Sequence, residues 1–201
     1  MAGSSLTAKE LSECTKHVSK MLENKCEHFL FFGSLLGYVR DGKPIDGDDD
    51  VDFYVNCDDS TIVRSLLLDN NFSIALEGTI KNNDYIIQAK KNQNGHRLTA
   101  DFYFYQDTDP FYLLEYWNVH ANPLDTTRVL KVPKPLIFPL QCQKYCDTDV
   151  YLPKHPEILC EFLYGINWKV KMRKSIDYHL NVIGGKPILL KRTNNTIKIM
   201  P

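Results

Sequence analysis

The sequence has no run of apolar residues long enough to cross a bilayer, and its polar N-terminus does not resemble a signal peptide. The first absence argues against a membrane span. As the sequence is written, both absences predict a cytoplasmic protein. A domain excised from a protein of the secretory lumen would also be compatible with them.

An excess of charge of one sign is also missing. The chain has 24 Lys and Arg against 25 Asp and Glu, a formal net charge of −1. General nucleic-acid binders usually carry a basic excess, so we expect no general nucleic-acid binding. The 201 residues, 43% of them hydrophobic, suffice for one substantial core, and the sequence has no internal repeats. We expect a single domain over residues 1–201.

The six cysteines lack the two close pairs that are typical of a structural zinc site. Cys142 and Cys146 have a loop-like spacing, and Cys160 is the nearest third candidate. Two interpretations stay open: a zinc ion at these three residues, or buried free thiols. The missing second pair favours free thiols.

Periodicity and turn residues predict the helices and strands. Thr7 and Glu10 form a capping-box pattern before a helix that ends near Lys25, and Gly165 is suited to end a helix at 156–164. Residues 184–201 have a weak pattern, so we expect a loose tail. The remaining predicted elements are strands at 28–32, 50–55, 72–76, 85–89 and 98–105, a helical turn at 34–39, a helix from about 60, and a polar hairpin turn at 91–95.

Two short motifs carry the chemistry. Asp50 and Asp52 are two apart on a predicted strand, so their carboxylates project from one face and can bind one hard cation or two neighbouring ones. Mg²⁺ prefers a few carboxylates together with phosphate oxygens. Gly33-Ser34 predicts a turn that brings backbone N–H groups and a hydroxyl close to a phosphate. Together the motifs predict metal-assisted transfer of a phosphorus-containing group.

Asp101 lies in the middle of an otherwise aromatic predicted strand. Burying a carboxylate is unfavourable unless a positive charge meets it, and a metal ion shared with Asp50 and Asp52 would supply that charge. The alternative is a solvent-facing side of the strand, which Tyr103 and Tyr105 permit. We favour the metal site, because the two earlier aspartates need a third ligand.

The order of these motifs resembles that of a known superfamily. Gly33-Ser34 followed by Asp50-Val51-Asp52-Phe53 resembles the signature of the nucleotidyltransferase fold, the DNA polymerase beta-like superfamily. The run from Gly33 to Arg40, with the acidic cluster at 48–52, is similar to the LicD/fukutin family. Matches farther along the chain are Phe138-Pro139-Leu140, Pro153, Tyr164-Gly165 and Trp168. The chain departs from the family at Asp46-Gly47, where Pro-Trp is usual.

The resemblance implies an α+β fold, a short mixed sheet flanked by helices, with the catalytic core at about residues 28–170. It also implies transfer of a phosphocholine or phospho-alditol group from a CDP-activated donor to a glycan hydroxyl. The partners would be a CDP-linked or other nucleotide donor and a glycan or small hydroxyl acceptor. The cofactor would be Mg²⁺ or Mn²⁺.

The site residues follow from the same match. Asp50, Asp52 and Asp101 would be catalytic and would hold the metal ions, with Asp101 either a general base as well or a ligand only. Asp48 and Asp49 would more readily face solvent or support the ligands.

Other residues would bind the substrates. Gly33, Ser34 and Arg40 would hold a donor phosphate, although a salt bridge from Arg40 to Asp41 or Asp48 is an equal alternative. Tyr164 and Trp168 would line a substrate pocket, although aromatic residues near a helix end more often belong to the core.

Two rival functions stay open on the same fold. A nucleotidyltransferase would pass a nucleotide monophosphate from a triphosphate to a small acceptor and release pyrophosphate. An inactive family member would bind a glycan or nucleotide without turnover.

Overall fold

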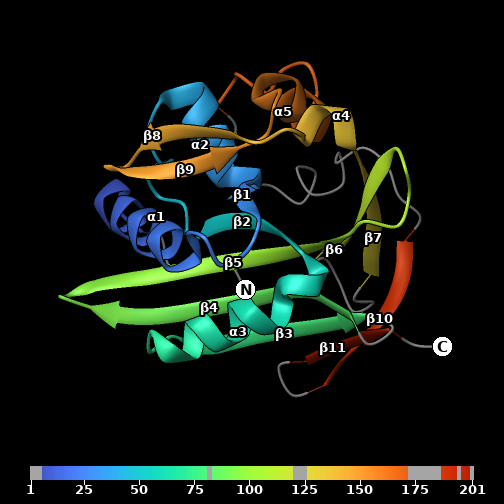
Figure 1. Ribbon diagram of the computed structural model, residues 1–201, viewed down its shortest axis with the longest axis horizontal. Helices are drawn as coiled ribbons and strands as arrows, with labels where there is room; N and C mark the ends of the chain where they lie inside the picture. The colour runs from blue at the N-terminus through green and yellow to red at the C-terminus, as the bar shows by residue number, and fades with distance from the viewer. Residues whose placement is uncertain (1–5, 81–82, 120–125, 172–186, 194–195, 200–201) are drawn as a thin grey trace.

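The computed structural model describes residues 6–80, 83–119, 126–171, 187–193 and 196–199 (Figure 1). Its helices are α1 (Ala8–Leu22), α2 (Phe32–Asp41), the 3-10 helix η1 (Cys57–Asp59), α3 (Ser60–Asp69), α4 (Lys134–Ile137) and α5 (Pro156–Tyr164). Its strands are β1 (His28–Leu30), β2 (Val51–Asn56), β3 (Ser73–Ile80), β4 (Asn83–Gln93), β5 (His96–Gln106), β6 (Tyr112–Val119), β7 (Thr126–Pro133), β8 (Gln141–Tyr145), β9 (Thr148–Leu152), β10 (Pro187–Thr193) and β11 (Thr196–Ile199).

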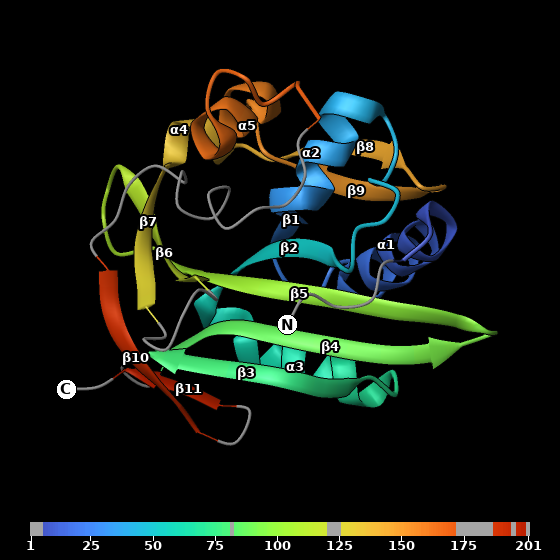
Figure 2. The ribbon, with the colours of Figure 1, turned by 180° about the vertical axis from the view of Figure 1, so that it is seen from behind.

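One large mixed sheet organises the structure, and the predicted α+β class is confirmed. Its nine described strands run in the order β1-β2-β5-β4-β3-β11-β10-β7-β6, and β6 pairs with β5 as well. The strands from β5 round to β6 therefore form a closed ring, from which β2 and β1 extend. The curl of β6, β7 and β10 at one end of the sheet is visible from both sides (Figures 1 and 2). Strands β8 and β9 form a separate hairpin.

The second half of the chain contains more regular structure than its sequence predicts. Strands β6 to β9 lie where the sequence gives no clear strand pattern. The tail, which we expected to be loose, contains β10 and β11, which pair with each other and with β7 and β3. Residues 184–186, 194–195 and 200–201 of that tail lie outside the described residues. The pairings with β7 and β3 are long-range, so local sequence patterns do not reveal them.

Helices α1 and α3 cover one face of the sheet, as the two opposite views show (Figures 1 and 2). The predicted capping box of α1 is confirmed: Thr7 accepts a hydrogen bond from the backbone of Glu10, whose side chain accepts from the backbone of Thr7. The helix buries a stripe of residues at helical spacing, Leu11, Cys14, Val18 and Leu22. Among the helices described, none combines the length and apolarity needed to cross a membrane.

Strands β2 and β5 place a phenylalanine pair and an aspartate pair on opposite faces of the sheet. They pair in parallel, with Phe53 opposite Phe102 and Asp52 opposite Asp101. The rings of Phe53 and Phe102 stack at 5.7 Å between centroids. Phe102 shares its face of β5 with Leu98, which lines a cavity together with residues of α1. The aspartates therefore project from the opposite face to the one that α1 covers.

A glycine in α2 fixes the loop that precedes the acidic residues. A Cβ atom on Gly37 would lie 2.9 Å from the backbone oxygen of Lys43 and 3.2 Å from the Ile45 side chain. The loop thus packs directly on the backbone of α2, and a larger residue has no room there.

Replacing this glycine should destabilise the protein. Gly37→Ala gains about 1 kcal/mol of helix propensity, but it forces a backbone shift of the kind that costs about 1–3 kcal/mol. We expect a net loss of unfolding free energy in urea titrations. Because the closest contact is with the backbone oxygen of Lys43, truncating the Ile45 side chain should not restore the stability of the variant. A stability equal to or above that of wild type would contradict the described packing.

Candidate active site

Three carboxylates converge at the start of β2. One oxygen from each of Asp50, Asp52 and Asp101 lies within 4.8 Å of the others. The parallel register places Asp52 directly opposite Asp101, and Asp50 directly precedes β2. Asp52 and Asp101 are 5% and 2% exposed, whereas Asp50 is half-buried. The structure thus brings the three predicted acidic residues into one group.

The grouping is electrostatically unfavourable without a positive charge. Burial, followed by the charges of Asp101 and Asp52, holds the pKa of Asp50 well above its usual range. The same carboxylates, after burial, raise the pKa of the nearby Tyr103 hydroxyl. The group therefore favours either a bound proton or a bound cation.

The donor set fits a hard divalent cation. All three side chains offer carboxylate oxygens, the ligands that Mg²⁺ prefers, and thiolate or imidazole ligands are missing from the group. A second acidic group, Asp48, Asp49 and Asp50, meets the same 4.8 Å criterion, so that Asp50 belongs to both. None of the ligand groups found in the described residues contains a cysteine, so the structure gives no support to a zinc ion at Cys142, Cys146 and Cys160.

Ser34 holds Asp52 in place. Its hydroxyl accepts a hydrogen bond of 2.8 Å from the Asp52 backbone N–H, and its own N–H donates to Asp52 Oδ2 at 3.3 Å. Phe32, two residues before Ser34, has a positive φ of 34°, a rare conformation for a bulky residue, at the point where the chain turns from β1 into α2. The turn thus aims the first N–H groups of α2 at the acidic side chains.

Gly33 lies directly against two of the acidic side chains. A Cβ atom at this position would lie 2.7 Å from Asp48 Oδ2 and 3.1 Å from Asp52 Oδ2. The space at this glycine, where we expected a donor phosphate, therefore adjoins two carboxylates. Phosphate binding at Gly33 and Ser34 stays a prediction.

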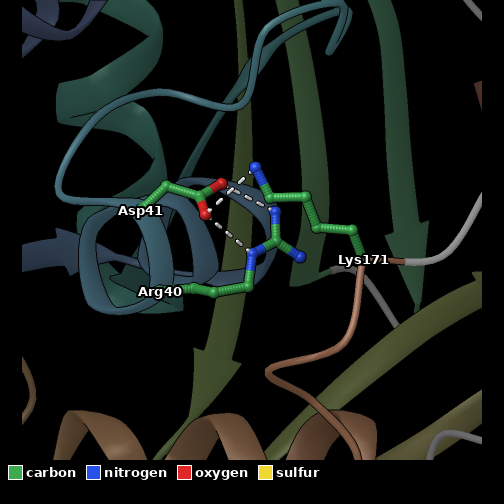
Figure 3. Close-up of polar contacts among 3 residues, drawn as sticks. All are labelled: Arg40, Asp41 and Lys171. Atoms are coloured by element: carbon green, nitrogen blue, oxygen red, sulfur yellow. Dashed lines mark hydrogen bonds and ion pairs between the residues drawn. The ribbon is translucent and has the colours of Figure 1, made fainter.

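Arg40 lies at the other end of α2. Six residues of helix separate it from Ser34, about 9 Å along the axis. Its guanidinium binds Asp41 through two hydrogen bonds, of 3.2 and 2.9 Å, and Lys171 Nζ lies 3.5 Å from the same carboxylate (Figure 3). Arg40 and then Lys171 hold the pKa of Asp41 below its usual range. The salt bridge that we considered as the alternative for Arg40 is thus present, to Asp41.

Tyr164 and Trp168 pack into or against the core. Trp168 is 6% exposed, and Tyr164, at the end of α5, is packed against the core cluster. The small hollow beside Asp50 is instead lined by Gly33, Ser34, Asp48 and Tyr145, among others. Tyr145 belongs to β8, which the sequence did not predict.

Sequence reasoning also missed two polar residues near the carboxylates. Gln88 donates a short hydrogen bond from its side chain to Asp101 Oδ2. A signal for it existed, because a two-residue turn at Asn94-Gly95 pairs Gln88 with Asp101 along the β4–β5 hairpin. Glu115 on β6 is fully buried, and no sequence signal marks it because β6 itself was not predicted.

The family model described as "LicD/FKTN/FKRP, nucleotidyltransferase domain" matches residues 25–155. The chain belongs to the LicD/FKTN/FKRP family. The match contains the Gly33-Ser34 turn and all three aspartates, so the acidic group lies inside the family's nucleotidyltransferase domain. The family resemblance drawn from the sequence is confirmed.

A solved structure supports the fold of this family member. The chain is similar to the lincosamide antibiotic adenylyltransferase LnuA, bound to lincomycin, with a TM-score of 0.51 and 14% sequence identity. The match covers 89% of this chain and 95% of LnuA. No curated protein matches the chain at the level of sequence.

Glu115 is the most unusual titratable group near the site. Burial raises its pKa to about 8, an effect that Tyr54 partly offsets and the charge of Asp52 reinforces. Tyr54 is close, yet neither Glu115 oxygen makes a hydrogen bond of normal geometry with the part of the chain that the structure describes. The carboxyl group is therefore protonated at neutral pH in the folded protein.

This burial predicts a pH-dependent stability. Between the unfolded pKa and about 8, the folded state holds a proton that the unfolded state releases, so the contribution of Glu115 falls as pH rises. Glu115→Gln should match wild type at pH 5 and exceed it at pH 8.5, at about 1.4 kcal/mol per pKa unit. Urea titrations across this range measure the difference. The control is Glu161→Gln at an exposed position, whose unfolding free energy should follow that of wild type at every pH. A difference between Glu115→Gln and wild type that does not change with pH would refute the assignment.

Proposed function

We propose that this family member is a metal-dependent transferase that moves a phosphocholine or phospho-alditol group from a CDP-linked donor to a glycan hydroxyl. The observation that carries the proposal is the group formed by Asp50, Asp52 and Asp101, within 4.8 Å of one another and beside the Gly33-Ser34 turn. Family membership supports a transferase.

The three aspartates would hold Mg²⁺ or Mn²⁺. When bound, such cations neutralise the charge that develops on a transferred phosphoryl group. Ser34 and Gln88 would orient two of the carboxylates, since each already hydrogen-bonds one of them. Asp101, deepest in the group, would accept the proton of the acceptor hydroxyl if it acts as a general base.

The start of α2 would bind the donor phosphate. Because the Ser34 hydroxyl oxygen accepts from the Asp52 N–H, its own hydrogen can be donated to a phosphate oxygen. Asp48 would have to move, since its carboxylate adjoins Gly33. Arg40 would contact a phosphate only after leaving Asp41, so we assign the first contact to Ser34 and Gly33.

A second candidate is nucleotidyl transfer from a triphosphate to a small acceptor. It is favoured by the likeness to LnuA, a lincosamide antibiotic adenylyltransferase. The same three aspartates would serve either reaction, so the products distinguish them. Release of CMP indicates a CDP-linked donor, and release of pyrophosphate indicates a triphosphate.

The test is a panel of CDP-linked donors and nucleoside triphosphates, with Mg²⁺ or Mn²⁺ and with chelator. We expect cleavage of a CDP-linked donor to CMP, and Asp52→Asn should lower the rate by at least about a thousandfold. The exposed Asp69→Asn, at the end of α3, carries the same charge change and should keep its activity.

Three outcomes would contradict the proposal. Turnover retained by Asp52→Asn in the presence of metal would exclude its assigned role. Pyrophosphate as the only product would establish the second candidate. Binding of donors without any cleavage would indicate an inactive member of the family.

A further inference from the structure

A cavity of about 190 Å³ lies between α1 and the tip of the β4–β5 hairpin. Helix α1 contributes Lys16, His17 and Lys20 to its lining, and the hairpin contributes Gln93, Asn94 and His96. It is larger than the hollow beside Asp50, but smaller than the roughly 300–1,000 Å³ of sites for cofactors and drug-sized ligands. Its size therefore suits a small ligand.

The cavity is separate from the acidic group. Leu98, which forms part of its lining, and Asp101 are three residues apart on β5, so their side chains project from opposite faces of the sheet. On α1, Leu11 and Thr15 line the hollow beside Asp50, whereas the lysines line the cavity. No described residue lines both sites.

The lining is rich in donors and in positive charge. Lys16 and Lys20 are four residues apart, so they lie on the same side of α1. Each ammonium offers three hydrogen-bond donors, and the amides of Gln93 and Asn94 offer more. Glu13 is the acidic residue in the lining, and it is exposed. Two lysines against one glutamate give the lining a net positive charge.

His17, in the lining of the cavity, has a buried ring nitrogen, Nε2, without a hydrogen-bond partner among the described residues. Burial and then the charge of Lys91 lower the pKa of this imidazole, so it is neutral at pH 7. His17 therefore contributes to the lining an uncharged imidazole with one unpaired ring nitrogen.

We propose that this cavity binds a small phosphate-bearing anion, with Lys16 and Lys20 as its main charged contacts and His17, His96 and the hairpin amides as further hydrogen-bonding contacts. The site lies outside the proposed reaction and would act as a second ligand site on the other side of the sheet. Glu13 weakens it, because its carboxylate repels an anion.

The test is a titration with inorganic phosphate and pyrophosphate, without divalent cations, followed by NMR of the ring resonances of His17 and His96. Chloride at matched ionic strength controls for screening. We expect saturable shifts at these two histidines in wild type. Lys16→Gln/Lys20→Gln should weaken binding at least tenfold, and Glu13→Gln should strengthen it about threefold.

The matched control is Lys9→Gln/Lys25→Gln, which removes two exposed charges at the two ends of α1, outside the lining. It should leave the affinity within about twofold of wild type. Shifts that never saturate, or an equal loss in both double variants, would overturn the proposal. If the first double variant fails to fold, an unchanged affinity of Glu13→Gln would overturn it as well. None of these readouts requires turnover, so the result is independent of the proposed function.

Discussion

Repulsion between buried carboxylates is the constraint on which the site depends. Asp52 and Asp101 face each other across two parallel strands, with Asp50 beside them, and burial with these neighbours raises the pKa of Asp50. Hydrogen bonds from Ser34 and Gln88 orient the carboxylates but supply no positive charge. Such an arrangement is unfavourable for folding unless a proton or a cation completes it. This is why we regard the group as built for binding.

The rest of the fold serves this arrangement. The β4–β5 hairpin sets the position of Gln88, and the turn into α2 sets that of Ser34. Gly33 and Gly37 allow the acidic loop to approach the backbone of α2 closely. The return of β6 to β5 closes the ring of strands, and Glu115 on β6 is buried beside Tyr54.

Local patterns predicted the short-range features of the chain well. The capping box at Thr7, the helix end at Gly165 and the paired aspartates all rest on contacts between residues close in sequence. The approach of Lys171 to Asp41 and the pairings of β10 with β7 and of β11 with β3 rest on contacts between distant residues, which one sequence does not display. Glu115 belongs to this second class. Gln88 is an intermediate case. The Asn94-Gly95 turn fixes its position opposite Asp101, but the sequence analysis did not identify its hydrogen bond to that carboxylate.

The central claim is that a divalent cation relieves the repulsion among the three aspartates, and thermal unfolding against cation concentration tests it most directly. We predict that Mg²⁺ or Mn²⁺ stabilises wild type saturably, by about 2.7 kcal/mol at a hundredfold excess over the dissociation constant. Asp101→Asn should be more stable than wild type in chelator and should lose the response to the cation. A wild-type protein whose unfolding ignores both cations, or an Asp101→Asn variant that responds as wild type does, would contradict the account.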